Sequence, residues 1–468
     1  MSCTTLVRAS DDSVSGEVVP LAKHEQMLGM YFNVTFAILY PGAKKPTHAA
    51  LATALAKALV PFKALAGRFV LSKEGLAIDC NNAGVPLTHD VGTGAAPSVE
   101  VPIAADLFDM VVDSVPASEG SASDAPMRVK VTDFDDAQLI AVSANHGLCD
   151  AGGLGAFMAA WASAYAGGTG EGGSAPSPVV SNDRVGAVPT TSEPGSVPPE
   201  TIPPDHPWRM LRPLPEQCPA LERASSDLEP PLLPGRVGCS PLHSCSPAHV
   251  ARATRVRAGV PLASPVIFSN TKSAADCKAL KAACLTAAAA PTGAFVSTND
   301  ALCAELCVAL GLEGVERVPF GLIMDYRAHV GVDGAASPYL FGNLWCTLEL
   351  LVRNSLAGAV DIREALRHAQ GAEFIKWFMG QGANRQFGAR LMMNTWVKAF
   401  RLAELAFEVP AADMMVGAPF LEQRLAMMAP AGVNYVIALP QADGGIKAVG
   451  VLGRSATERL TGKMHTVA

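Results

Sequence analysis

The sequence lacks several features that would place it at once in a class of protein. It has no run of about 18 apolar residues, so we expect no membrane-spanning helix. It has no basic excess: the net charge of −7 argues against a general nucleic-acid binder, although a local basic patch could still hold an anionic cofactor. The first residues carry Asp11, Asp12 and Glu17 without an apolar segment, so neither a secretory signal nor a transit peptide is expected. We therefore expect a soluble, cytoplasmic, monomeric protein.

Motifs for metal, phosphate and covalent chemistry are also missing. The 11 cysteines are odd in number and stand mostly in apolar runs, as buried free thiols do in a reducing compartment. No Cys-x-x-Cys pair or histidine cluster has zinc spacing, so no metal is expected. There is no G-x-S-x-G elbow and no P-loop. Residues 168–173 match G-x-G-x-x-G, but they follow a helical pattern, whereas that fingerprint needs a strand before it and a helix after it.

Residues 137–166 carry the clearest functional signal. An apolar run at 137–144, typical of a buried strand, ends just before His146, and large apolar residues then recur at helical spacing. A scaffold can aim a side chain into a cleft where a strand ends and a helix begins, so His146 is the candidate general base for deprotonating an alcohol or amine. Two alternatives stay open. His146 could be an ordinary core or surface histidine, and Asp150 could simply cap the helix.

The rest of the chain alternates predicted strands and helices. Strands are expected at 31–40, 127–134, 138–144, 266–270, 318–325 and 344–352, with hairpins at 68–80 and 435–452; helices are expected at 48–65, 273–290, 296–310 and 361–378. This pattern gives an α/β class with two domains of similar size, residues 1–166 and 256–468. Residues 167–255 are rich in Gly, Ser and Pro and are predicted to be a partly disordered crossover linker.

Several motifs occur in one order along nearly the whole chain, and together they resemble the BAHD family of acyl-CoA-dependent acyltransferases. The family's H-x-x-x-D-G motif matches residues 146–150 (HGLCD), and the frame of its D-F-G-W-G-x-P motif matches residues 413–419 (DMMVGAP). Shorter matches are LAGR at 65–68, IDCN at 78–81, STNDAL at 297–302, DYR at 325–327, YLFGN at 339–343, NTW at 394–396 and PAGV at 430–433. Ala151, Met414 and Val416 depart from the motifs, which indicates a divergent member.

The resemblance implies a fold of two chloramphenicol-acetyltransferase-like domains, with mixed sheets flanked by helices and an active-site channel at the domain interface. It implies that acyl-CoA, as co-substrate, gives its acyl group to a hydroxyl or amine of a small-molecule acceptor, without an acyl-enzyme and without a metal. His146 would be the general base. Asn394 and Trp396 are candidate donors to the oxyanion, through an amide N–H and an indole N–H.

The resemblance also implies structural roles away from the chemistry. Asp150 would turn away from the channel and pair with an arginine, for which Arg327 in the D-x-R segment is the candidate. Exchanging the charges at both positions should then restore folding that each single change impairs. Asp413 and Gly417 would shape a loop far from the reacting atoms.

Some assignments stay open between alternatives. Lys272, Lys278 and Lys281 are the nearest feature to a basic patch for the CoA phosphates, but a solvated helix face explains them equally well. A catalytically degenerate protein that binds CoA or a small molecule on the same fold is an alternative to the enzyme. A condensation-type enzyme, which takes its thioester from a carrier protein, is another. That family usually doubles the histidine, and Asn145 here counts against it.

Overall fold

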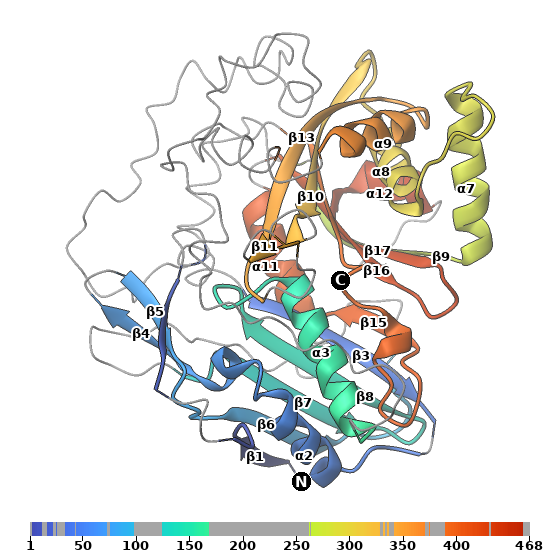
Figure 1. The fold of residues 1–468 in the computed structure, drawn as a ribbon. Helices are drawn as coiled ribbons and strands as arrows, with labels where there is room; N and C mark the ends of the chain where they lie inside the picture. Colours follow the sequence, from blue (N-terminus) through green and yellow to red (C-terminus); the bar gives the residue numbers. More distant parts are fainter. Residues whose placement is uncertain are drawn as a thin grey trace.

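Two six-stranded sheets, one in each half of the chain, form the framework of the protein in a computed structural model (Figure 1). The structure describes residues 2–97, 124–167 and 262–461, with gaps at 12–15, 22–24, 26–32, 43, 73–74, 263, 328–330, 333–334, 337–340, 370–373, 375–388 and 430–431. The predicted linker at 167–255 lies outside the described residues except for Gly167.

The first sheet is built around a fully buried strand. Its order is β1 (Cys3–Val7), β6 (Val85–Val91), β7 (Met127–Asp133), β8 (Ala137–Asn145), β3 (Asn33–Pro41) and β15 (Asp413–Val416). All nine residues of β8 are buried, as their apolar run predicts. Helices α2 (His48–Ala58) and α3 (Ala151–Tyr165) lie together over this sheet (Figure 1). A small sheet of β2 (Val18–Pro20), β5 (Gly75–Asp79) and β4 (Arg68–Ser72) stands beside it.

The second sheet has the order β13 (Trp345–Arg353), β10 (Arg317–Asp325), β14 (Leu391–Thr395), β16 (Asn434–Pro440), β17 (Ile446–Gly453) and β9 (Pro265–Lys272). Its helices are α7 (Ala274–Ala287), α8 (Thr298–Ala309), α9 (Gly358–His368), α11 (Ala418–Met428) and α12 (Arg454–Thr461). Ser273 and Ser297 begin α7 and α8 with complete capping boxes, in which Asp276 and Asp300 return a hydrogen bond to the serine N–H. Strands β11 (Gly331–Val332) and β12 (Ala335–Ala336) form a short ribbon.

Strand β16 joins the two halves because its faces belong to different cores. Val436 and Ala438 pack into the core under α8 and α9, whereas the alternate residues belong to the core of the first half. After β14 the chain crosses over the first half, where Phe400 packs against Phe36, and it then adds β15 to the first sheet. The second half of the chain therefore completes the sheet of the first.

Helix α3 approaches the crossing segment very closely. A side-chain carbon at Gly155 would lie 1.9 Å from the carbonyl oxygen of Ala399, so only glycine fits there. The short 3₁₀ turn η8 (Leu402–Glu404) follows in the crossing segment, and a second one, η2 (Lys63–Ala66), follows α2. The close approach of Gly155 to Ala399 holds the beginning of α3 against the second half of the chain.

The α/β class with two sheets flanked by helices is confirmed. The predicted helix at 48–65 is shorter than expected: α2 ends at Ala58, because Pro61 lacks the N–H that a continuing helix needs. The predicted helix at 361–378 begins earlier, at Gly358, and its described part ends at His368. The elements that were not predicted are strands β1, β2, β6, β11, β12, β14 and β15 and helices α11 and α12. No described helix combines the length and the apolar character needed to cross a membrane.

Candidate active site

His146 stands directly after the central strand β8, where a short turn leads into α3. The side-chain oxygen of Asn145 accepts the backbone N–H of Gly147 at 2.8 Å and closes the turn. The carboxylate of Asp150 accepts the N–H of Gly153 at 2.9 Å and caps α3. His146 is half-buried, while the residues on both sides of it are buried. A rigid strand end and a capped helix thus hold the imidazole at the junction of the two halves.

Asn343 holds His146 with two hydrogen bonds, and together they define the tautomer of the ring. The amide nitrogen of Asn343 donates to the backbone carbonyl of His146 at 2.7 Å, and its oxygen lies 2.9 Å from His146 Nδ1. A carbonyl oxygen only accepts, so the amide must turn its nitrogen toward the backbone and its oxygen toward the ring. Nδ1 therefore carries the hydrogen, and Nε2 of neutral His146 is the nitrogen with the lone pair that a general base requires.

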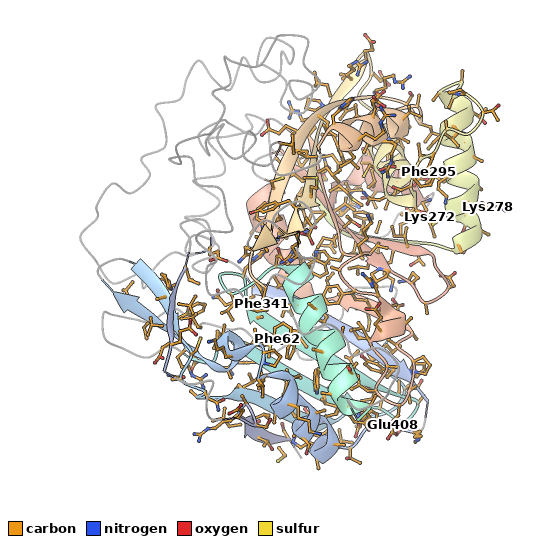
Figure 2. All side chains as sticks on the ribbon, viewed as in Figure 1. Phe62, Lys272, Lys278, Phe295, Phe341 and Glu408 are labelled. Carbon is orange, nitrogen blue, oxygen red and sulfur yellow. The ribbon has the colours of Figure 1, made fainter. Side chains whose placement is uncertain are left out.

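Asn343, which clamps His146, is itself held by residues from the first half of the chain. The backbone N–H of Asn343 donates to the carboxylate of Glu25 at 3.2 Å, and Glu25 is only 1% exposed. Two residues before Asn343, the ring of Phe341 meets the ring of Phe62 edge-on, with centroids 5.3 Å apart (Figure 2). These contacts lock the clamp in place and limit its freedom to rotate.

The surroundings keep His146 neutral. Burial, followed by the positive charge of Arg424, lowers the pKa of His146 to about 4. The hydrogen bonds to Asn343 and the negative charge of Asp150 oppose this shift but do not reverse it. Near neutral pH the imidazole is therefore in the form that can accept a proton.

The carboxylate of Asp150 forms a buried ion pair with Arg327. Arg327 donates to one carboxylate oxygen at 2.6 Å, and the backbone N–H of Leu344 donates to the other at 2.9 Å. Burial alone would raise the pKa of Asp150, but Arg327 and these N–H groups outweigh burial and lower it. Both proposals for Asp150 thus hold: it pairs with Arg327 and it caps α3.

The geometry corrects the expectation that exchanging the two charges would restore the fold. An arginine at position 150 could not accept the N–H groups of Gly153 and Leu344. An aspartate at position 327 could not donate to the carbonyl of Gly342, which Arg327 reaches at 2.7 Å. The pair is present, but each partner also serves fixed backbone groups, so the roles are not interchangeable.

Gly152 leaves room for the guanidinium of Arg327. A side-chain carbon at Gly152 would lie 2.6 Å from Nη1 of Arg327 and 3.0 Å from the carboxylate of Asp325. Asp325 itself pairs with Arg327 at 3.0 Å. Glycine one step later than in the motif therefore leaves the room that the guanidinium needs.

Asn394 and Trp396 lie at the end of β14 and just beyond it. The amide nitrogen of Asn394 is 3.4 Å from the hydroxyl of Tyr435, to which it donates. Trp396 is 3% exposed, and its indole N–H has no hydrogen-bond partner among the described residues. A buried donor without a partner is costly, so this N–H is suited to a ligand oxygen.

Asp413 begins strand β15, where the resemblance implied a loop. Lys447 of β17 donates to both of its carboxylate oxygens at 2.8 Å, and Gln441 donates to one of them at 2.8 Å. Lys447 is 1% exposed, so this ion pair is buried. Gly417 follows the strand with extended backbone and precedes α11. Asp413 therefore fastens β15 to the hairpin of the second sheet.

The three lysines lie apart from His146, on β9 and α7. Lys272 pairs with Glu305 at 2.8 Å, while Lys278 is exposed on α7. Figure 2 shows Lys272 and Lys278 beside α7, well separated from Phe341 near the beginning of α3. Their predicted contact with CoA phosphates stays a prediction. Among the described residues no group of His, Cys, Asp or Glu could hold a metal ion.

Sequence reasoning missed three residues of this region. Asn343 was noticed only within the YLFGN match, although a polar residue between two apolar ones was a usable signal. Arg424 and Tyr435 carried no signal, because nothing in one sequence indicates that α11 and β16 meet near His146. Folding alone brings them together.

Comparisons with known proteins agree with this architecture. A model of the "Transferase family" matches residues 3–206. The fold resembles vinorine synthase with a TM-score of 0.60 at 15% identity, over 99% of this chain and 96% of that one. It resembles TRI101 of F. graminearum, solved with coenzyme A and deoxynivalenol, with a TM-score of 0.64 at 14% identity, over 96% of this chain and 98% of that one.

A condensation domain shares the same architecture less closely. The first condensation domain of the CDA synthetase matches with a TM-score of 0.54 at 14% identity, over 97% of this chain and 98% of that one. No curated protein matches the sequence. The family model thus matches the N-terminal part of the chain, and the fold is shared with these structures over nearly its whole length.

Proposed function

We propose that the protein transfers an acyl group from acyl-CoA to a hydroxyl or amine of a small-molecule acceptor, with His146 as general base. The observation that carries the proposal is the clamp by Asn343, which places the hydrogen of the neutral imidazole on Nδ1 and makes Nε2 its basic nitrogen, at the junction of the two halves. The structure of TRI101 with coenzyme A and deoxynivalenol, on the same fold, supports CoA as the carrier.

The reaction needs one proton to move and one acyl bond to change. Nε2 of His146 takes the proton from the acceptor as its oxygen or nitrogen attacks the thioester carbonyl. The carbonyl oxygen becomes an oxyanion, to which the indole N–H of Trp396 and the amide N–H of Asn394 can donate. When the intermediate collapses, the carbon–sulfur bond breaks, and the imidazolium returns the proton to the CoA thiolate. The products are the acylated acceptor and free CoA.

The environment of His146 suits this sequence of steps. Its lowered pKa ensures a neutral base, while the Nδ1–H bond to Asn343 is kept in both charge states and stabilises the imidazolium. Asp150 lies too deeply in its ion pair to relay a proton, since both of its oxygens are already held by donors. The aspartate of the motif therefore supports the turn that carries His146.

The test is release of free CoA thiol with a panel of acyl-CoAs and pooled alcohols and amines. His146→Ala should lower acceptor-dependent release by about a hundredfold or more, because it removes the general base. His368→Ala is the matched control, since His368 pairs with Glu364 on helix α9 and should keep wild-type activity. Release that is unchanged in His146→Ala would contradict the proposed base. CoA binding without release from any donor would instead indicate a binding protein.

A further inference from the structure

The side chain that holds His146 projects from a short strap, residues 342–344, which leads into β13. Gly342 has a φ of 137°, a conformation that favours glycine, so the chain turns at this residue and gains freedom to rotate there. Asn343 follows at once and makes both hydrogen bonds to His146. The direction of its amide therefore depends on how firmly the strap is held.

Two carboxylates hold the two peptide groups on either side of the Cα atom of Asn343. Glu25 accepts the N–H of Asn343 at 3.2 Å, and this N–H belongs to the peptide group before that Cα atom. Asp150 accepts the N–H of Leu344 at 2.9 Å, and this N–H belongs to the peptide group after it. A residue has only two soft backbone dihedrals, so fixing both peptide planes also fixes the direction of the side chain of Asn343.

Glu25 adds a restraint that the other contacts of the strap do not supply. The peptide group between Gly342 and Asn343 is also held at its carbonyl, to which Arg327 donates at 2.7 Å. A hydrogen bond at one end leaves a peptide group free to swivel about that bond, and the glycine resists the swivel only weakly. The hydrogen bond to Glu25 at the other end stops it, and Glu25 is only 1% exposed, so water is kept from this bond.

We propose, on the basis of the function above, that Glu25 is a positioning residue for His146. By accepting the N–H of Asn343, it keeps the oxygen of the Asn343 amide against Nδ1, and Nε2 therefore keeps the lone pair. Glu25 acts here as an acceptor and not through its charge, so an amide oxygen at the same place can replace it. Glu25 and His146 belong to the first half of the chain and Asn343 to the second, so the base is oriented only while the two halves are docked.

Three variants of Glu25 separate its roles as acceptor and as charge. Glu25→Gln keeps the length of the side chain and an acceptor oxygen but removes the charge. Glu25→Met has a similar length without the acceptor, and Glu25→Ala is a second variant that lacks it. Glu404→Leu is the control, because Glu404 lies at the surface, where it pairs with Arg401, and should keep wild-type activity.

The release of CoA thiol measures the effect of each variant, and far-UV circular dichroism checks its fold. Glu25→Met and Glu25→Ala should lower kcat by about tenfold, because a misaligned base slows the chemical step. KM should stay within about twofold of wild type, since the change affects the transition state and not the binding of substrate. Glu25→Gln should stay within about threefold of wild type in both constants. A tenfold loss of kcat in Glu25→Gln would by itself overturn the proposal.

Nitrogen-15 NMR of protein labelled at histidine separates this inference from the proposed function, because it needs neither substrate nor turnover. A ring nitrogen that carries a hydrogen and one that carries a lone pair are distinct, and the signals of His146 are those that disappear in His146→Ala. Wild type and Glu25→Gln should have the hydrogen on Nδ1, whereas Glu25→Met should have a larger share of it on Nε2.

The two kinds of failure then give different results. If the tautomer changes in Glu25→Met but the wild type transfers no acyl group, the positioning role stands and the transferase function fails. If Glu25→Met keeps the wild-type tautomer, the positioning role is wrong, whatever the activity of the variant.

Discussion

The buried pair of Asp150 and Arg327, beside the exposed Asp325, makes an asymmetric prediction about stability. Arg327→Met leaves Asp150, which is 7% exposed, without its cation, and loss of one partner of a buried pair costs about 3–5 kcal/mol. Asp150→Asn is milder, because Arg327 keeps Asp325 and the carbonyl of Gly342. Its cost is about 1–3 kcal/mol, since the N–H of Leu344 loses its acceptor.

The stability that depends on the ionisation of Asp150 should change with pH in opposite directions in the wild type and in Arg327→Met. In the wild type the pKa of Asp150 is lower than in the unfolded chain, so its contribution is present above about pH 4 and is lost as the pH falls through the folded pKa. In Arg327→Met, only the N–H groups of Gly153 and Leu344 oppose burial, so we expect that pKa to rise above the unfolded value. The destabilisation of Arg327→Met is then present at neutral pH and is relieved on acidification.

Urea unfolding at about pH 7 and pH 5, followed by circular dichroism, measures these differences. The double variant Asp150→Asn with Arg327→Met should be more stable than Arg327→Met alone, because no buried carboxylate is then left at position 150. Arg401→Met is the control, since its pair with Glu404 is exposed and should contribute less than about 1 kcal/mol. A cost below about 1 kcal/mol for Arg327→Met, or a double variant whose cost is the sum of the singles, would refute the reasoning.

Two further predictions concern the base. The pKa of about 4 for His146 predicts that kcat/KM stays level from about pH 8 to pH 5 and falls only below pH 5, because a protonated imidazole cannot accept the acceptor's proton. A pH profile of kcat/KM that falls near pH 6.5, the ordinary histidine value, would contradict the buried environment. Asn343→Ala frees the ring to place its hydrogen on Nε2, so kcat should fall by about tenfold or more while the far-UV spectrum stays unchanged; a single-turnover rate equal to wild type would show that the amide does not hold the tautomer.

Local pattern was enough to predict most of the fold. The apolar run at Ala137–Asn145, the hairpin at Asn434–Gly453 and the helices α7 and α8 each depend on neighbours in sequence, and each was predicted close to its observed bounds. Strand β15 was missed because it has four residues and is a strand only through its pairing with β3. No periodicity can reveal a partner that lies nearly 400 residues away in the chain.

The features of the site likewise divide into those that the sequence predicted and those that only the tertiary structure decided. The sequence by itself placed His146 between a buried strand and a helix, and it offered Asp150 as the cap of that helix. Only the tertiary structure decided which nitrogen of His146 carries the hydrogen, since the clamp comes from Asn343, 197 residues further along. It also decided the charge beside the base, because α11 brings Arg424 there through packing on Tyr435. Hydrogen-bond direction and burial are properties of assembled surfaces, and they exist only after the two halves have met.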